Sequence, residues 1–190
     1  MTDKDQIIIA KVLSGNTNAY TYLVNDYKDF VFTIAFNIVK NREDAEDIAQ
    51  ESFVKAYKQL HTFKGDSKFS TWLYTITFRT AISANRKLAI AITEVDDYVL
   101  NNFEDDDLAS QITVLNAEDQ KYYIEKAMKN LPELDALVLT LYYLNEHTTE
   151  EIEKITGFSK VNIKVRMHRA RKKLADSLKE ILPKEAVLWR

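Results

Sequence analysis

The sequence predicts an all-α protein built from two small helical domains, joined by a flexible acidic linker, with a helix-turn-helix in the C-terminal domain. Three observations predict this class. Apolar residues recur at helical spacing over most of the 190-residue chain. Only 3 glycines and 2 prolines interrupt the pattern, too few for the frequent turns of a β-sandwich or barrel. Between the two helical stretches lies an acidic segment that lacks helical periodicity.

The formal charge of −3 is distributed unevenly along the chain. Residues 1–90 have 12 basic and 10 acidic side chains, residues 91–118 have 8 acidic and none basic, and residues 119–190 have 14 basic and 11 acidic. The acidic excess therefore belongs to one segment, and both flanking parts are mildly basic. We expect domains at 1–90 and 118–182 and place the linker, which mutual repulsion keeps extended, at 91–117.

The composition excludes several functional classes. The chain has no cysteine, so it has no disulfide framework, thiolate metal site or cysteine nucleophile. Its 3 histidines are scattered, and no glycine-rich nucleotide loop or nucleophile–base arrangement is present. No apolar run has the length of a signal sequence or a membrane span. We therefore expect a protein that is cytoplasmic, or nuclear if eukaryotic. We also expect that it is not an enzyme, inserts into no membrane, and needs no metal or cofactor.

Apolar spacing predicts four helices in each domain. Those of the N-terminal domain are expected at 3–14, 18–40, 43–60 and 70–87, with a break in the second allowed near Asp26–Asp29. Those of the C-terminal domain are expected at 118–130, 132–145, 149–156 and 159–181.

Several helix ends in the C-terminal domain have a physical explanation. Thr148 and Glu151 have the spacing of a capping box. Gly157 can adopt the left-handed conformation that closes a helix, and Ser159 can cap the helix that follows. Pro183 cannot continue that helix.

The segment from Thr149 to Leu174 has the form of a helix-turn-helix: a helix, a Gly-containing turn and a longer helix. Projecting residues 159–174 at about 100° per residue gives one narrow apolar stripe. This stripe comprises Ile163, Met167, Ala170 and Leu174. The opposite face has Val161, Val165, His168, Arg169 and Lys172, flanked by Lys164 and Arg166. From Lys160 to Lys173 there are 7 basic residues and no acidic one, as a major-groove recognition helix requires. The alternative is an ordinary solvated basic helix.

This helix-turn-helix resembles a known family. The run from Thr156 to Leu174 (TGFSKVNIKVRMHRARKKL), with the preceding stretches 131–137 and 150–152, is similar to the fourth region of extracytoplasmic-function sigma factors of the sigma-70 superfamily. In that family this domain reads the upstream, or −35, promoter element. The resemblance implies that Lys164, Val165, His168 and Arg169 face the bases. It also implies that Arg166 and Arg171 contact the DNA backbone, and Lys160 and Lys172 complete the predicted DNA-binding set.

The helix at 43–60 has a second distinctive surface. Its buried stripe is predicted to comprise Ala45, Ala49, Ser52, Ala56 and Leu60. The other side presents Asp47, Gln50, Glu51, Val54 and Lys58, which in isolation would be a solvated acidic face. However, the run from Asn41 to Tyr57 resembles the second region of the same family. The resemblance implies that Asp47, Gln50 and Glu51 bind the clamp helices of the polymerase β′ subunit, where opposite charge steers association.

The run from Phe63 to Tyr74 resembles the loop and helix with which the family recognises the −10 element. Trp72, Thr75, Arg79, Ser83 and Arg86 are predicted to share one stripe, and interleaved aromatic and basic groups suit single-stranded DNA. The predicted contacts to melted DNA are Phe63, Lys64, Asp66, Ser67, Phe69, Trp72, Arg79 and Arg86, with loop 63–68 receiving an extruded base. That Phe69 and Trp72 are ordinary core aromatics remains the alternative.

Together the two resemblances cover about 18–88 and 118–180 in the expected order. They imply an alternative sigma factor that acts in the bacterial cytoplasm and directs core RNA polymerase to promoters. Its partners would be the polymerase, at the β′ clamp and the β flap, promoter DNA as duplex and melted strand, and an anti-sigma factor. The alternative function is a stand-alone helix-turn-helix regulator, which would explain 149–174 but not the acidic helix or the aromatic stripe.

Overall fold

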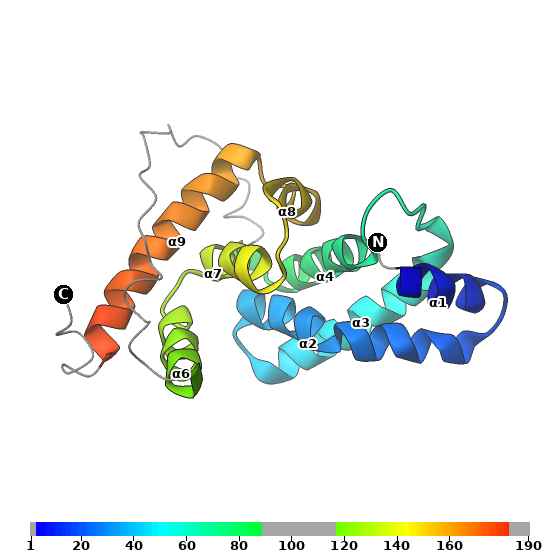
Figure 1. Cartoon of the computed structure of the whole chain (residues 1–190), viewed down its shortest axis with the longest axis horizontal. Coiled ribbons are helices and arrows are strands. Elements are labelled where there is room, and N and C mark those ends of the chain that lie inside the picture. The colour runs from blue at the N-terminus through cyan, green and yellow to red at the C-terminus, as the bar shows by residue number, and fades with distance from the viewer. Residues whose placement is uncertain (1–2, 89–116, 183–190) are drawn as a thin grey trace. The chain divides into compact units, whose positions relative to one another are not determined.

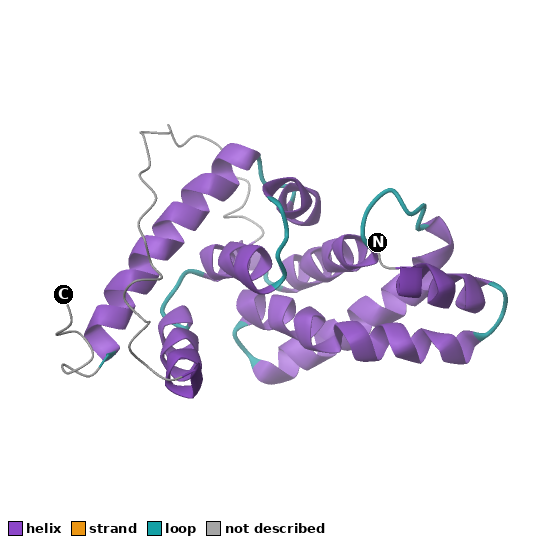
Figure 2. Ribbon diagram, in the orientation of Figure 1, coloured by secondary structure: helices purple, strands orange, loops and turns teal. Residues whose placement is uncertain are grey.

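The computed structural model describes residues 3–88 and 117–182. Every regular element in these two stretches is a helix, with no strand (Figure 2). They form two compact units. The first unit comprises the described residues of Met1–Val95 with Thr148–Phe158, and the second those of Asp96–His147 with Ser159–Arg190.

The all-α class with two helical domains is confirmed. The linker predicted at 91–117 lies, except for its last residue, outside the described residues. The domain boundaries at 1–90 and 118–182 stay predictions.

The first unit contains five of the labelled helices. They are α1 (Asp3–Leu13), α2 (Tyr20–Val39), α3 (Arg42–Gln59), α4 (Phe69–Ala84) and α8 (Thr149–Thr156). Helices α2, α3 and α4 pack on one another, and α8 packs on α4 (Figure 1). The interior of the unit contains fully buried side chains from all these helices except α1, among them Leu23, Ile34, Ile38, Leu73 and Ile152.

The ends of α2 and α3 are set locally. Lys40 takes the left-handed conformation, with φ 55°, and its N–H donates to the Phe36 carbonyl, which closes α2. The Asn41 side chain then accepts from the Asp44 N–H at 3.1 Å and caps α3. The break allowed near Asp26–Asp29 is absent, because both carboxylates are exposed to solvent and leave the helix backbone intact.

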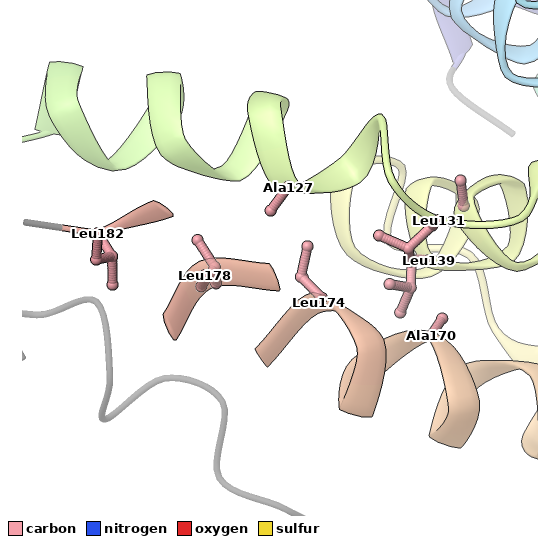
Figure 3. Close-up of a cluster of buried hydrophobic side chains, with 8 residues drawn as sticks. Ala127, Leu131, Leu139, Ala170, Leu174, Leu178 and Leu182 are labelled. Carbon is pink, nitrogen blue, oxygen red and sulfur yellow. The ribbon is translucent and has the colours of Figure 1, made fainter. Parts of the chain in front are cut away.

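The second unit is formed by α6 (Ala117–Met128), α7 (Glu133–Leu139), a π-helical turn (Thr140–Leu144) and α9 (Lys160–Ile181). The helix predicted at 132–145 is therefore divided, because its last turn widens into the π form. Figure 3 shows the apolar cluster that holds α6, α7 and α9 together. Its buried members are Ala127, Leu131, Ala136, Leu139, Ala170, Leu174, Leu178 and Leu182.

The predicted caps around α8 and α9 are confirmed. The Thr148 hydroxyl accepts from the Glu151 N–H at 3.2 Å, and the Glu151 carboxylate accepts from the Thr148 N–H at 3.0 Å. Gly157 closes α8 with φ 77°, a conformation that favours glycine. Ser159 caps α9 by accepting from the Asn162 N–H at 3.2 Å.

Candidate functional site

The outer face of α3 is a continuous exposed patch. Asp47, Gln50 and Glu51 are all exposed on this helix, and Val54 beside them is 52% exposed. The opposite side is core: Ala45, Ser52, Ala56 and Leu60 are buried as predicted, together with Ile48 and Phe53. Ala49 is only half-buried. The structure therefore brings the three predicted docking residues together on one surface.

The helix that presents this acidic patch packs firmly against the core. Only part of the patch's negative charge is neutralised by a neighbouring cation. Glu51 forms an ion pair with Lys55 at 2.7 Å across one helical turn, and both side chains remain substantially exposed. Exposed pairs of this kind contribute little to stability, so they exchange readily for a partner's cation. The patch can bind a basic surface without rearrangement of α3.

The loop before α4 is built on an aromatic cluster. Phe63, Phe69 and Trp72 lie with ring centroids 5.3–5.7 Å apart, in edge-on or tilted arrangements. Phe63 and Trp72 are half-buried, whereas Phe69 is fully buried and also contacts Tyr27. Phe69 is therefore a core residue that supports the loop, because a fully enclosed ring has no face on which a base can stack. This corrects its predicted role as a DNA contact.

The other predicted contacts to melted DNA lie near the surface. Lys64, Asp66, Arg79 and Arg86 are exposed, and Ser67 is half-buried. On the α4 stripe, Ser83 is also exposed, and Trp72 and Thr75 are half-buried. The helix predicted at 70–87 ends at Ala84, so Trp72, Thr75, Arg79 and Ser83 lie on α4 and Arg86 follows it. A half-buried ring and an exposed guanidinium group on one helix suit single-stranded nucleic acid.

Helix α8 contacts this stripe at its ring end. The Thr75 hydroxyl lies 3.3 Å from the Lys154 carbonyl oxygen of α8, and Lys68 forms an ion pair with Glu151 at 2.9 Å. Below them, Phe78 meets Phe158 edge-on, with ring centroids 5.9 Å apart, and both rings are buried. The sequence analysis did not anticipate these contacts, because they join residues 79 or more positions apart.

Helix α9 has the predicted apolar stripe. Ile163, Met167, Ala170 and Leu174 are all buried, which confirms the helical projection. On the other side Lys160, Lys164 and Lys172 are exposed, and His168, Arg169 and Arg171 are half-buried. Val165, however, is buried at 7% exposure, so the outward face is narrower than predicted and its predicted contact with bases is not available in this structure.

Arg166 differs most from its prediction. Its side chain is buried, and its Nη1 donates to the Asp135 carboxylate at 2.9 Å. Its Nε donates to the Asn162 side-chain oxygen at 2.7 Å. The pKa of Arg166 lies below its ordinary value, because the effect of burial outweighs the opposing effects of the hydrogen bond to Asp135 and of that carboxylate's charge. A guanidinium held inside the unit does not reach a phosphate, which corrects its predicted role as a backbone contact.

Arg171 of α9 and Tyr143 of the π-helical turn form a further hydrogen-bonded pair in the second unit. Arg171 Nε donates to the Tyr143 hydroxyl at 2.9 Å, and the guanidinium also lies over the same ring, 5.6 Å from its centroid. These two contacts with Tyr143 hold the Arg171 side chain in one orientation. Asp135 and Tyr143 were not predicted from the sequence, because no motif marks a partner that lies outside α9. Asn162 lies one turn before Arg166 on α9, and this spacing could have indicated it.

The described residues show neither a metal-binding cluster nor a transmembrane helix. No group of three or more His, Cys, Asp or Glu side chains among them has the arrangement to hold a metal ion. Within the same residues, no helix combines the length and apolarity needed to cross a membrane.

Comparison with known proteins agrees with this geometry. Residues 23–89 match the family described as sigma-70 region 2, and residues 121–174 match the family described as sigma-70, region 4. The first match contains α3 and α4, and the second contains α7, α8 and most of α9.

Whole-length relatives give the same result. The chain is 29% identical over 180 residues to the ECF RNA polymerase sigma factor SigW of Bacillus subtilis, covering 91% of this chain and 96% of that protein. It is 29% identical over 186 residues to the ECF RNA polymerase sigma-E factor of Salmonella typhimurium, covering 94% and 96%.

Solved structures share the fold. The sigma factor RpoE of Bartonella quintana, solved with the anti-sigma factor NepR, superposes with a TM-score of 0.60 at 22% identity, covering 86% of this chain and 98% of that one. CnrH, solved with the cytosolic domain of CnrY, gives 0.58 at 22% identity, covering 95% and 100%. From the two regional matches and the whole-length relatives, the chain belongs to the sigma-70 family and is an RNA polymerase sigma factor of the extracytoplasmic-function (ECF) group.

Proposed function

We propose that this sigma factor binds core RNA polymerase through the exposed acidic face of α3. The observation that carries the proposal is the division of α3 into a buried apolar side and an exposed side with Asp47, Gln50 and Glu51. Carboxylates on a rigid helix complement a basic helical partner, and the resemblance identifies that partner as the clamp helices of the β′ subunit.

Two further surfaces are assigned to promoter DNA. The exposed side of α9, with Lys164, His168 and Arg169, reads the upstream element in the major groove. Loop 63–68 and the α4 stripe bind the melted strand of the downstream element, with Phe63 and Trp72 available for stacking and Arg79 and Arg86 for phosphates. The exposure of Lys164 on α9, of Arg79 on α4 and of Arg86 just after α4 supports this assignment.

The remaining assignments follow from this role. We assign the chain no catalytic step, since the polymerase performs the chemistry, and place its action in the bacterial cytoplasm with the chromosome. An anti-sigma factor is proposed as a regulatory partner, because one structural neighbour is a sigma factor solved with such a protein.

The proposal is tested by reversing charge on α3. Changing Asp47 and Glu51 together to Lys should abolish co-purification with bacterial core polymerase while helical content stays unchanged. Breaking a desolvated, hydrogen-bonded charge contact costs about 2–5 kcal/mol, enough to lower affinity at least thirtyfold, by roughly the tenfold per 1.4 kcal/mol conversion.

A matched control applies the same charge change elsewhere. Asp29→Lys with Glu180→Lys alters two exposed carboxylates outside α3 and should leave polymerase binding intact. Equal binding of core polymerase by the α3 variant and this control would overturn the assignment of α3.

A further inference from the structure

Asp135 is a buried carboxylate that sequence analysis did not select. It lies in the first turn of α7, with its side chain 5% exposed, and receives the Arg166 guanidinium of α9 at 2.9 Å. The same Oδ1 atom lies 3.9 Å from Nη2 of Arg169, whose side chain is 40% exposed. One interior carboxylate thus faces a buried arginine and a partly exposed arginine on the same helix.

The geometry around Arg166 is directional. Its Nη1 is bound to Asp135 and its Nε to Asn162, one turn earlier on α9. The bond to Asn162 lies within α9 and fixes the direction of the guanidinium, which is planar and has donors in fixed directions. The bond to Asp135 then ties this fixed group to α7, which restricts how α9 can rotate against α7.

The apolar cluster shared by α7 and α9 contains no directional bond. Its members on these helices include Ala136 and Leu139 of α7 and Ala170 and Leu174 of α9. Figure 3 labels Leu139, Ala170 and Leu174. When one helix rotates slightly against the other, alanine and leucine side chains can repack at modest cost. They therefore hold the two helices together but do not fix one rotation of α9 against α7.

Stability alone does not explain a charge pair in this position. Desolvation of two buried charges offsets most of their attraction, and apolar pairs of similar volume often replace them without loss of stability. In some proteins a buried polar or ionic group instead selects one packing arrangement. Arg169 lies one helical turn after Arg166, so the arrangement of the Asp135–Arg166 pair bears on where Arg169 points.

We propose that Asp135 is a positioning residue for promoter specificity: by binding Arg166 and attracting Arg169, it sets the rotation of α9 and aims Arg169 at the upstream element. The inference rests on the proposed function, since it concerns the face of α9 assigned to DNA. Asp135 contacts no base itself. It acts through Arg166 and Arg169.

The test replaces the pair by an apolar one. In the double variant Asp135→Leu, Arg166→Met, both charges are removed together and no unpaired charge remains in the interior. Asp135→Asn is a second variant that keeps the size of the side chain and an acceptor oxygen but loses the charge. Asp176→Asn, an exposed carboxylate on α9, is the matched control for charge.

Each variant is assembled with core polymerase, and holoenzyme binding is measured over a promoter library randomised in the upstream element. We expect the double variant to melt within a few degrees of the wild type. Its discrimination against single-base changes in the upstream element should fall roughly tenfold, the size expected when one base contact loses its geometry. Discrimination in the downstream element and the salt dependence of binding should stay unchanged, because the number of phosphate contacts is the same. Asp135→Asn should fall between the double variant and the control.

Two results are kept distinct. If the wild-type holoenzyme selects its upstream element and both Asp135 variants select it equally well, Asp135 has only a structural role and this inference is overturned. If the wild-type holoenzyme shows no selection in either element, the proposed function fails instead.

Discussion

Helices α4 and α9 are both assigned to promoter DNA, but they expose different chemistry. Within Phe69–Ala84, α4 has 4 aromatic residues, 1 basic residue and no acidic one. Within Lys160–Ile181, α9 has 8 basic residues and no aromatic one. The first surface suits bases released from the duplex, which stack on rings. The second suits an intact duplex, whose phosphates and guanine edges attract cations.

In the basic helix the buried and exposed side chains differ clearly in chemical type, whereas in the aromatic helix the same type of side chain occurs on both sides. On α9 the apolar residues are buried or half-buried except Val161, and the cations reach the surface except Arg166. On α4 and its loop, aromatic rings serve as both core and interface. Phe69 is enclosed, whereas Phe63 and Trp72 are half-buried parts of the same cluster.

The largest effect on transcription is expected when a disulfide fixes α8 to α4. Cysteines at Thr75 and Lys154 would join two positions that are in contact, and the chain has no native cysteine to compete for the disulfide. With this disulfide formed, Thr75 stays covered and the melted strand is excluded from the ring end of the stripe. We expect run-off transcription to be lost in the oxidised form and restored by a reducing agent.

The two single-cysteine variants are the controls, and both should transcribe under either condition. Full transcription by the oxidised double variant, with the disulfide verified by mass spectrometry, would show that α8 does not obstruct the stripe.

A smaller effect is expected on α9, where specificity and affinity should separate. Arg169→Ala should cost about 1–3 kcal/mol on the preferred upstream site and flatten the preference at one base position. Lys172→Ala, at an exposed lysine, should weaken binding to all sequences and reduce the salt slope by about 1. Binding measured across upstream-element variants and salt concentrations distinguishes the two. Uniform weakening by Arg169→Ala would make Arg169 a phosphate contact.

Much of the fold could be predicted from local sequence because local physics determines it. The stripe from Ile163 to Leu174 follows from helical periodicity, and the capping box of Thr148 and Glu151 follows from a three-residue spacing. The exposed patch of α3 follows in the same way from the side opposite Ala45 and Ser52.

The errors in the site come from side-chain packing, which a helical projection does not contain. A helical projection gives the angle of Arg166 but not the carboxylate of Asp135, 31 residues earlier, which draws it inside. The projection also places Val165 on the outward face, whereas the structure buries it. For Phe69, aromatic character predicts core and DNA stacking equally well, and only the packing of Tyr27, Phe63 and Trp72 around it decides.

The central claim is that the chain directs core polymerase to specific promoters. The most direct test is run-off transcription from the DNA upstream of the gene that encodes the chain. We predict a discrete transcript when the chain and bacterial core polymerase are both present, and none with core polymerase alone or with the Asp47→Lys, Glu51→Lys variant. The contradicting result would be no discrete transcript from the complete mixture together with a shift of the same duplex by the chain alone. That outcome would identify a stand-alone helix-turn-helix regulator.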